Sequence, residues 1–196
     1  MMYKAPVYMT MLHYPILDKQ GGVISTAVTN LDVHDGGRLC ATYNIKRYFL
    51  VTPLEEQQAL VHRIRGHWVD GPGARKTPTR RIAMEKALPA SDLQAVVDLI
   101  TEEEGQAPLL VGTSARPQET TGIGYNELRG QIWEGERPIL LVFGTGWGIA
   151  DSVTPALERF LPPILGPGTE YNHLSVRAAI AITIDRLLGR YEENDA

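Results

Sequence analysis

The segment LLVFGTGWG at residues 140–148 decides how the C-terminal part of this chain folds. A short apolar run that ends in several glycines is typical of a buried strand followed by a tight loop. Glycine has no side chain, so its backbone can pass close to a ligand. We therefore expect a strand over residues 139–143 and a ligand-facing loop after it. A branched side chain at Gly146 is expected to enter the slot beside this loop.

Two segments further along the chain complete this pattern. The first is LPPI at residues 161–164, a loop that its prolines stiffen. The second is YNHLSVRAAI at residues 171–180, which opens a strongly apolar helix over residues 175–188. Two exposed backbone loops that face each other across a slot suit an adenosine group.

Apolar periodicity elsewhere predicts an alternation of strands and helices. We expect strands at residues 7–12, 24–28, 48–51 and 109–112, and helices at residues 35–43, 55–68, 91–103 and 125–133. Ser91 with Gln94 three residues later is typical of a capping box. Residues 71–86 are expected to form a basic loop. Strands separated by helices favour an α/β fold with a mainly parallel sheet covered on both faces.

Charge is distributed unevenly along the chain, whose net charge is −4. Residues 63–86 hold seven basic and two acidic residues, so this segment carries +5 and the remainder −9. Such a local excess can hold nucleic-acid phosphates despite the acidic average. The alternative is an ordinary solvated surface. RNA contact is expected at Arg75, Lys76, Arg80 and Arg81, and at Arg116 outside this segment.

Several classes of protein are disfavoured by composition. The only cysteine, Cys40, excludes an intramolecular disulfide and is expected to be a buried small hydrophobe. His13, His62 and His67 have no carboxylate or cysteine spacing that indicates a metal site. The apolar run at residues 7–12 is too short to span a membrane. We expect a cytoplasmic protein without a metal.

The terminal helix is apolar on more than one side. Between residues 176 and 188 its polar residues are Arg177, Thr183, Asp185 and Arg186. Such a helix needs burial beyond one stripe, either in the core of a monomer or against a second subunit. A charged residue at Ile184 is expected to dissociate or unfold the protein.

The glycine loop, the proline loop and the Ser-initiated terminal helix, in this order, resemble the cofactor-binding half of the SPOUT superfamily of knotted RNA methyltransferases. The resemblance implies one SPOUT-type domain over residues 1–196, with a C-terminal trefoil knot formed by residues 143–178. It also implies S-adenosylmethionine as the cofactor and a homodimer whose protomers share their active sites. The implied cofactor-binding residues are Thr113, Ser114, Phe143, Gly144, Thr145, Gly146, Gly148, Ile164, Asn172, Leu174 and Ser175.

The N-terminal half carries a second part of the resemblance. Residues 29–43 look like the first motif of the ribose-methylating branch, in which a helix bears an arginine, here Arg38, with an aromatic residue five positions later. Aligned on Arg38, Asp32 and His34 depart from the asparagine and glycine usual in that branch. The overall match is closest to a bacterial family of RNA methyltransferases that also occurs fused to tRNA guanine-N1 methyltransferase.

Chemical roles can be assigned to these residues. A ribose hydroxyl is a weak nucleophile, and a guanidinium has no acceptor site, so Arg38 is expected to orient the hydroxyl and stabilise its oxyanion. Asp35 or His34 is the expected proton acceptor. Ser175 and His173 match the family's third motif and are expected near the methyl group and the substrate. Alternatively, Ser175 or Asn172 caps the helix.

Several functions remain open on sequence alone. The preferred function is 2′-O-methylation of ribose in tRNA or rRNA. Base methylation, such as at guanine N1, would need an aspartate base, Asp35 or Asp151. A non-catalytic RNA-binding protein with this fold is a third possibility. A dinucleotide-dependent dehydrogenase fits less well, because proline-rich segments follow the glycine loop in place of another βαβ unit.

Overall fold

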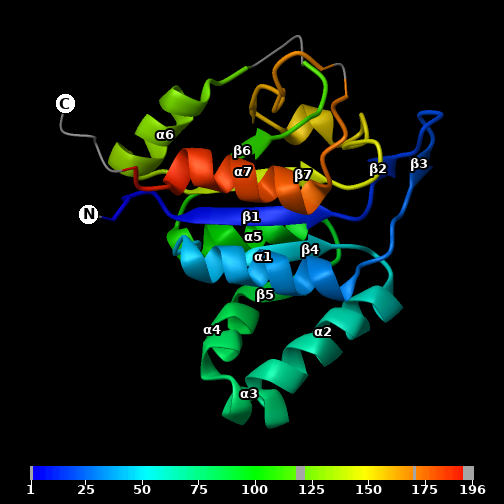
Figure 1. Cartoon of the computed structure of the whole chain (residues 1–196), viewed down its shortest axis with the longest axis vertical. Coiled ribbons are helices and arrows are strands. Elements are labelled where there is room, and N and C mark those ends of the chain that lie inside the picture. Colours follow the sequence, from blue (N-terminus) through cyan, green and yellow to red (C-terminus); the bar gives the residue numbers. More distant parts are fainter. Residues whose placement is uncertain (1, 118–121, 170, 192–196) are drawn as a thin grey trace.

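A six-stranded parallel sheet forms the centre of the computed structural model, which describes residues 2–117, 122–169 and 171–191. Its strand order is β5-β4-β1-β7-β6-β8 (Figure 1). The strands are β1 (Val7–Leu12), β4 (Tyr48–Val51), β5 (Ala87–Ala90), β6 (Leu109–Gly112), β7 (Ile139–Gly144) and β8 (Arg159–Phe160). A separate antiparallel hairpin joins β2 (Ile16–Leu17) and β3 (Val23–Ile24).

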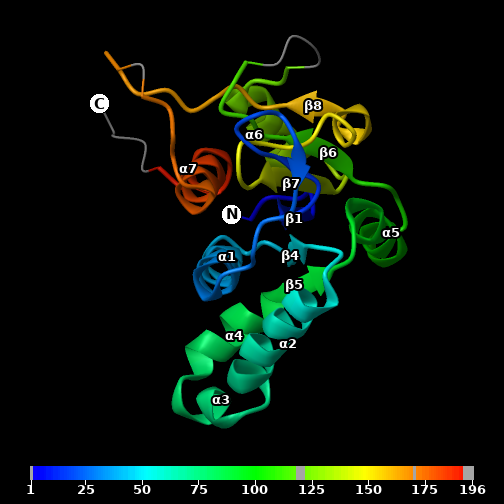
Figure 2. The ribbon, with the colours of Figure 1, turned by 90° about the vertical axis from the view of Figure 1, so that its right-hand side faces the viewer.

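Helices cover both faces of this sheet, as the α/β prediction requires. They are α1 (Asn30–Thr42), α2 (Glu55–Val69), α3 (Pro72–Lys76), α4 (Pro78–Lys86), α5 (Leu93–Glu104), α6 (Tyr125–Glu134), α7 (Val176–Leu188) and the short 3₁₀ segment η1 (Thr154–Ala156). Figure 2 shows α1 and α7 on one side of the sheet and α5 on the other. The mainly parallel sheet flanked by helices is therefore confirmed.

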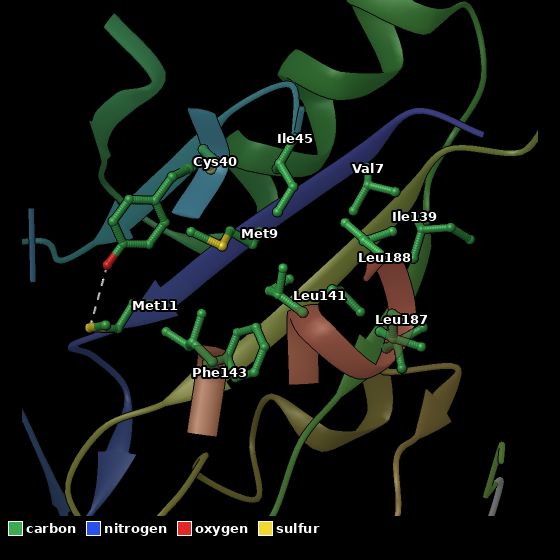
Figure 3. Close-up of a cluster of buried hydrophobic side chains, with 14 of the residues drawn as sticks. Val7, Met9, Met11, Cys40, Ile45, Ile139, Leu141, Phe143, Leu187 and Leu188 are labelled. Atoms are coloured by element: carbon green, nitrogen blue, oxygen red, sulfur yellow. Dashed lines mark hydrogen bonds between the residues drawn. The ribbon is translucent and has the colours of Figure 1, made fainter. Parts of the chain in front are cut away.

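The core consists of two apolar layers, one on each face of the sheet. All six residues of β1 are buried, because neighbouring strands and helices enclose it on both faces. Val7, Met9 and Met11 meet α1 and α7 on one face, where Cys40 is fully buried (Figure 3). The prediction that Cys40 is a buried small hydrophobe is therefore confirmed, and this burial raises the pKa of its thiol.

Helix α1 starts five residues earlier than predicted and so contains Gly36 and Gly37 in its interior. Both glycines are there because neighbouring residues leave no room for a side chain. A Cβ atom at Gly36 would lie 2.1 Å from the Tyr48 ring, and one at Gly37 would lie 2.6 Å from the carbonyl oxygen of Ala83. The backbone of α1 therefore packs so closely against β4 and α4 that only glycine fits at these two positions. Its true start is a capping box between Thr29 and Asp32.

The predicted basic loop is helical instead. Both α3 and α4 begin with a proline. Proline is tolerated at the first helical position because the backbone N–H that it lacks would have no partner within the helix there. Together with α2, these helices extend beyond the β5 edge of the sheet (Figures 1 and 2). The basic segment is thus a helical projection and not a flexible loop.

Three smaller predictions were wrong. The strand predicted at residues 24–28 is only the two-residue β3. Strands β5 and β8 were missed, since β5 contains Pro89 and β8 has two residues. Helix α5 is capped by Asp92, whose side chain accepts a hydrogen bond from the Ala95 amide, and not by Ser91.

The terminal helix α7 is buried on one side within the chain itself. Ile180, Ile184 and Leu187 are at most 1% exposed. A charged residue at Ile184 would therefore unfold the chain and would not report on a subunit contact. Ala181 and Ile182 are only half-buried, so the part of the helix that could meet a second subunit is narrower than the sequence suggested.

Candidate active site

A cavity of about 680 Å³ opens at the carboxyl ends of β6, β7 and β8. In parallel α/β sheets this edge is the usual place for ligands, and the volume lies within the roughly 300–1,000 Å³ of small-molecule sites. The residues that line it are Thr113, Ser114, Ala115, Arg116, Tyr125, Phe143, Gly144, Thr145, Gly146, Trp147, Gly148, Pro162, Ile164, Asn172, His173, Leu174, Ser175, Val176, Ala179 and Thr183.

Every residue predicted to bind the cofactor lies in this lining. The structure thus brings together three segments that are far apart in sequence: the end of β6, the glycine loop after β7 and the stretch before α7. Sequence reasoning missed several helical contributors, among them Tyr125 on α6 and Ala179 and Thr183 on α7. Periodicity predicted these helices but did not indicate which of their faces would meet a cavity.

The glycine loop is held against the β2–β3 hairpin. Trp147 donates its amide hydrogen to the Leu17 carbonyl, and the Leu17 amide donates to Gly148. Gly146 has φ +57°, and a Cβ atom there would lie 2.6 Å from the Ile16 side chain. A side chain at Gly146 would therefore collide with the hairpin. The expectation that it would enter the slot is wrong.

The start of α7 and the loop after β6 meet at the cavity. Ser175 is the N-cap of α7 and accepts a hydrogen bond from the Ala178 amide, so its capping role is confirmed. Asn172 donates from Nδ2 to the Ala115 carbonyl over 2.8 Å, and so it ties the two segments together instead of capping. Both residues also line the cavity. The capping hydroxyl of Ser175 thus lies at the cavity wall.

Arg177 links α7 to the start of α1. Its Nη1 donates to Asp35 Oδ2 at 3.0 Å, and its Nε lies 3.6 Å from Asp32 Oδ1. Asp32 is buried and also accepts hydrogen bonds from the Thr29 amide and hydroxyl. Asp32 therefore has a structural role at the helix start, which explains an acid at that position.

His34 and Arg38, which share α1 with Asp35, have different surroundings. His34 is buried, and its Nδ1 accepts a hydrogen bond from Arg80 at 2.7 Å. Burial first, and then the Arg80 charge, lower the pKa of His34. Because Nδ1 is already an acceptor, this contact disfavours His34 as the proton acceptor. Arg38 is exposed on the same helix.

The catalytic residues predicted on α1 do not line the cavity. None of Arg38, Asp35 and His34 belongs to its lining. Among the described lining residues there is no aspartate or glutamate, and Arg116 and His173 are the basic side chains. The cavity of one chain thus has one imidazole as a proton acceptor.

A buried polar network behind the glycine loop was not predicted. His13 is 1% exposed and shares a hydrogen bond through Nδ1 with the Thr26 hydroxyl, which in turn shares one with the Thr145 hydroxyl at 2.6 Å. Among the described residues His13 Nε2 has no hydrogen-bond partner, and it lies 4.0 Å from Asp32 Oδ2. Burial lowers the pKa of His13, while Asp32 opposes this effect. His13 is thus a core histidine joined through Thr26 and Thr145 to the cavity wall.

The basic helices offer fewer available cations than the sequence implied. Arg80 lies 5.5 Å from the centroid of the Trp68 ring and donates to His34, and Arg81 pairs with Glu85. Arg75 and Lys76, by contrast, are exposed on α3. The four residues predicted in this segment thus differ in their surroundings, and their contact with RNA stays a prediction.

The described residues contain neither a candidate membrane span nor a candidate metal cluster. No helix within residues 2–117, 122–169 and 171–191 has the length and apolar character needed to cross a membrane. In the same part of the chain, no group of three or more potential ligands could hold a metal ion.

The fold and the cavity define a class of protein. A probable methylase family protein from Haemophilus influenzae Rd KW20 has the same fold, with a TM-score of 0.59 and 16% identity over 93% of this chain and 65% of that one. The family model for SAM-dependent RNA methyltransferases matches residues 6–189. The chain belongs to this family, and S-adenosylmethionine is its cofactor.

Two relatives are similar over nearly the whole chain. A protein of Aquifex aeolicus, described as uncharacterized, is 40% identical over 184 residues, which are 94% of this chain and 89% of the relative. The tRNA (guanine-N(1)-)-methyltransferase of Nitratidesulfovibrio vulgaris is 41% identical over 186 residues, which are 93% of this chain and 42% of the relative. This chain thus spans less than half of the second relative.

Membership of this family confirms the predicted cofactor and the predicted class of enzyme. Because this family consists of SAM-dependent RNA methyltransferases, its description supports neither the dehydrogenase nor the non-catalytic alternative. The cavity fits the cofactor, because glycines line one wall and leave its backbone accessible, while Ile164 and Leu174 are apolar surfaces for a purine ring. Which residues hold the cofactor stays a prediction.

Proposed function

We propose that this protein methylates the ribose 2′-hydroxyl of tRNA or rRNA in a site formed by two copies of the chain. The observation that carries this proposal is the composition of the cavity. Its described lining holds no carboxylate, and the exposed Arg38 and half-buried Asp35 of α1 lie outside it. The described lining supplies the His173 imidazole, whereas the carboxylate and the guanidinium of the proposed chemistry come from outside it, and α1 of a second copy is their proposed supplier.

The proposed chemistry needs little beyond positioning and charge. S-adenosylmethionine supplies a methyl group on a positively charged sulfur. The backbone of residues 144–148 and the Thr113 and Ser114 segment hold the cofactor across the cavity. Ser175 and His173 lie at the wall next to the start of α7 and orient the substrate there.

Arg38 has the proposed role of oxyanion donor. A ribose hydroxyl loses its proton only with difficulty, and a guanidinium beside the developing alkoxide stabilises its charge. Arg38 is exposed and one helical turn from Asp35, so the two side chains share a face of α1. Asp35 then receives the proton, since the Arg80 contact occupies the Nδ1 atom of His34.

A homodimer is part of this proposal. The half-buried face of α7 that includes Ala181 and Ile182 supports it, as does the exposed Leu31 on the neighbouring α1, which is 53% exposed. Arg177 joins the two helices through Asp35. A second copy that packs across α1 and α7 would bury this surface and bring its own α1 toward the cavity.

The RNA itself is proposed to contact Arg75 and Lys76 on α3, with further help from Arg80, Arg81 and Arg116. These side chains lie on the projection formed by α2, α3 and α4, except Arg116, which lines the cavity. Phosphate contacts at the projection would orient the RNA, and Arg116 would act nearest the reacting nucleotide.

Base methylation at guanine N1 is the second candidate. The name of the Nitratidesulfovibrio vulgaris relative favours it, although this chain covers 42% of that protein. It requires a base near the substrate nitrogen, and Asp151 is exposed and outside the described cavity lining. Asp35, whose carboxylate accepts a hydrogen bond from Arg177, would then have to serve as the base, as it does in the ribose mechanism, so this residue does not separate the two candidates.

Three further features remain proposals. The chain is one SPOUT-type domain over residues 1–196, it is knotted by residues 143–178, and it acts in the cytoplasm. The hydrogen bond from Asn172 to Ala115 supports the knot, since it joins the segment before α7 to the earlier loop after β6. Threaded chains are rare, so the family resemblance is the main support.

The direct test is analysis of the methylated product. The protein is incubated with labelled S-adenosylmethionine and unfractionated tRNA or rRNA, and the RNA is digested to nucleosides for mass spectrometry. Label on the ribose supports the proposal. Label on a guanine base would overturn it in favour of the second candidate.

A further inference from the structure

Three aromatic rings form a row at the mouth of the cavity. The ring centroids of Trp147 and His173 are 5.8 Å apart with an interplanar angle of 69°, and those of His173 and Tyr171 are 5.2 Å apart with an angle of 67°. Trp147 comes from the glycine loop, and the other two precede α7. Trp147 and His173 line the cavity while Tyr171 does not, so the row runs from the cavity to the outer surface.

The outer rings of this row are unusually exposed. Trp147 is 43% and Tyr171 73% exposed, although both are large and mainly apolar. An edge-to-face contact covers at most one of the two faces of a ring, and the exposure of Trp147 and Tyr171 shows that both outer rings keep area open to solvent. A contiguous exposed aromatic surface beside a ligand cavity indicates a binding surface.

The charge beside the aromatic row indicates which kind of ligand it would bind. Arg116 lines the same cavity and brings positive charge, which suits an anionic polymer. Aromatic faces combined with a cation are how proteins hold unpaired nucleic-acid bases, which stack on the rings while phosphates meet the charge. A base within a duplex is already stacked on both sides and offers no free face.

We propose that Trp147, His173 and Tyr171 form a stacking platform for an unpaired RNA base at the reacting nucleotide or its neighbour. The inference rests on the proposed function, and it adds that the enzyme selects single-stranded or flipped nucleotides. Stacking fixes the base at the mouth of the cavity and turns its sugar toward the bound cofactor. Tyr171 is a positioning residue here, since it lies outside the cavity lining.

The experiment measures tryptophan fluorescence with S-adenosylhomocysteine bound, so that the cavity is filled and the rings respond to RNA alone. The probe is a single-stranded oligouridylate, alone and annealed to oligoadenylate. We expect the single strand to quench the fluorescence and the duplex to do so much less, and Trp147→Leu to remove most of the quench. Tyr171→Leu should weaken single-strand binding about 5- to 150-fold, the range measured for loss of one stacking ring.

Controls separate stacking from other effects. Tyr171→Phe keeps the ring and should bind like the unchanged protein, and Tyr191→Leu removes a tyrosine that is 63% exposed at the far end of α7. Equal quenching by duplex and single strand, or full binding by Tyr171→Leu, would overturn the platform. A loss of S-adenosylmethionine affinity in Tyr171→Leu would assign the rings to the cofactor instead. Because the readout is binding, a base-methylated product would overturn the proposed ribose chemistry and leave the platform standing.

Discussion

Arg38 is the residue on which the proposed chemistry depends most. Because an oxyanion donor acts only in the transition state, Arg38→Ala should lower kcat by roughly 10²-fold or more and leave cofactor affinity unchanged. Arg38→Lys should rescue activity only in part, since a point charge lacks the planar fork of a guanidinium. Steady-state kinetics and calorimetry with S-adenosylmethionine measure the two effects.

Arg159→Ala is the matched control, as it removes another exposed arginine away from the cavity. It should retain normal turnover. Equal loss of turnover and of cofactor affinity in Arg38→Ala would show that Arg38 supports the fold or the cofactor and not the reaction.

His13 makes stability depend on pH. Burial lowers the pKa of folded His13 below its ordinary value of 6.5. As the pH falls, the unfolded chain therefore binds a proton at His13 before the folded protein does. The contribution of neutral His13 is therefore present above that value and is lost as the pH falls toward the folded pKa. Replacing it with glutamine removes the titration. As the pH falls from about 7.5 to 5.5, urea unfolding should show the unchanged protein losing more stability than His13→Gln.

If the difference in unfolding free energy between the unchanged protein and His13→Gln stayed the same at every pH, the pKa of His13 would be equal in the folded and unfolded states. That result would contradict the prediction. The hydrogen bond from His13 to Thr26 predicts a further, pH-independent cost for the variant, because a glutamine cannot reproduce the ring geometry.

At the scale of elements, the apolar runs predicted β1, β4 and β6 with their true bounds, because these strands are buried throughout and bounded by polar or turn residues. The helices of the basic segment were missed, since glycine and proline signal a loop until tertiary contacts override them. Gly73, for example, lies where a Cβ atom would be 2.6 Å from the Trp68 ring. No local pattern reveals such close packing.

The candidate site also has a part that the sequence predicted and a part that it did not. The segments around the cavity were predicted because their loops carry unusual glycines, prolines and caps in a recognisable order. The polar network was not, because Thr26 and Thr145 meet across 119 residues of sequence. Contacts of that kind depend on strand order, which periodicity alone does not determine.

The cavity wall formed by α7 can be tested with one helix residue. Ala179 is half-buried and lines the cavity, so Ala179→Leu adds bulk on that wall without harming helix propensity. Cofactor affinity should fall about 5- to 150-fold, as expected for overpacking, and calorimetry measures it. Ala95→Leu, at an exposed position on α5, should bind normally. Unchanged affinity in Ala179→Leu would remove α7 from the cofactor site.

The helical projection can be tested through its charge. Reversing Arg75 and Lys76 to glutamate should weaken RNA binding across sequences and reduce the salt dependence, because each lost phosphate contact lowers the slope by about one. Filter binding at several salt concentrations measures both. Arg81→Glu is a weaker test, since Arg81 already pairs with Glu85. Salt-independent binding by the unchanged protein would place the RNA elsewhere.

At the scale of the whole molecule, the central claim is that two copies build one site. Two defective variants, Arg38→Ala and Ala179→Leu, can be co-expressed with different tags, purified as a mixed dimer and assayed at a cofactor concentration that leaves the Ala179→Leu cavity largely empty. If α1 of one copy completes the cavity of the other, one of its two sites combines an intact α1 with an intact cavity. If each chain formed its own site, both sites would carry a defect.

The decisive measurement is ribose methylation of unfractionated tRNA or rRNA by this mixed dimer, with each variant homodimer as the control. The two-copy site predicts about half the activity of the unchanged dimer, against nearly none for either homodimer. A mixed dimer as inactive as its parents, or a protein that is active as a monomer, would contradict it.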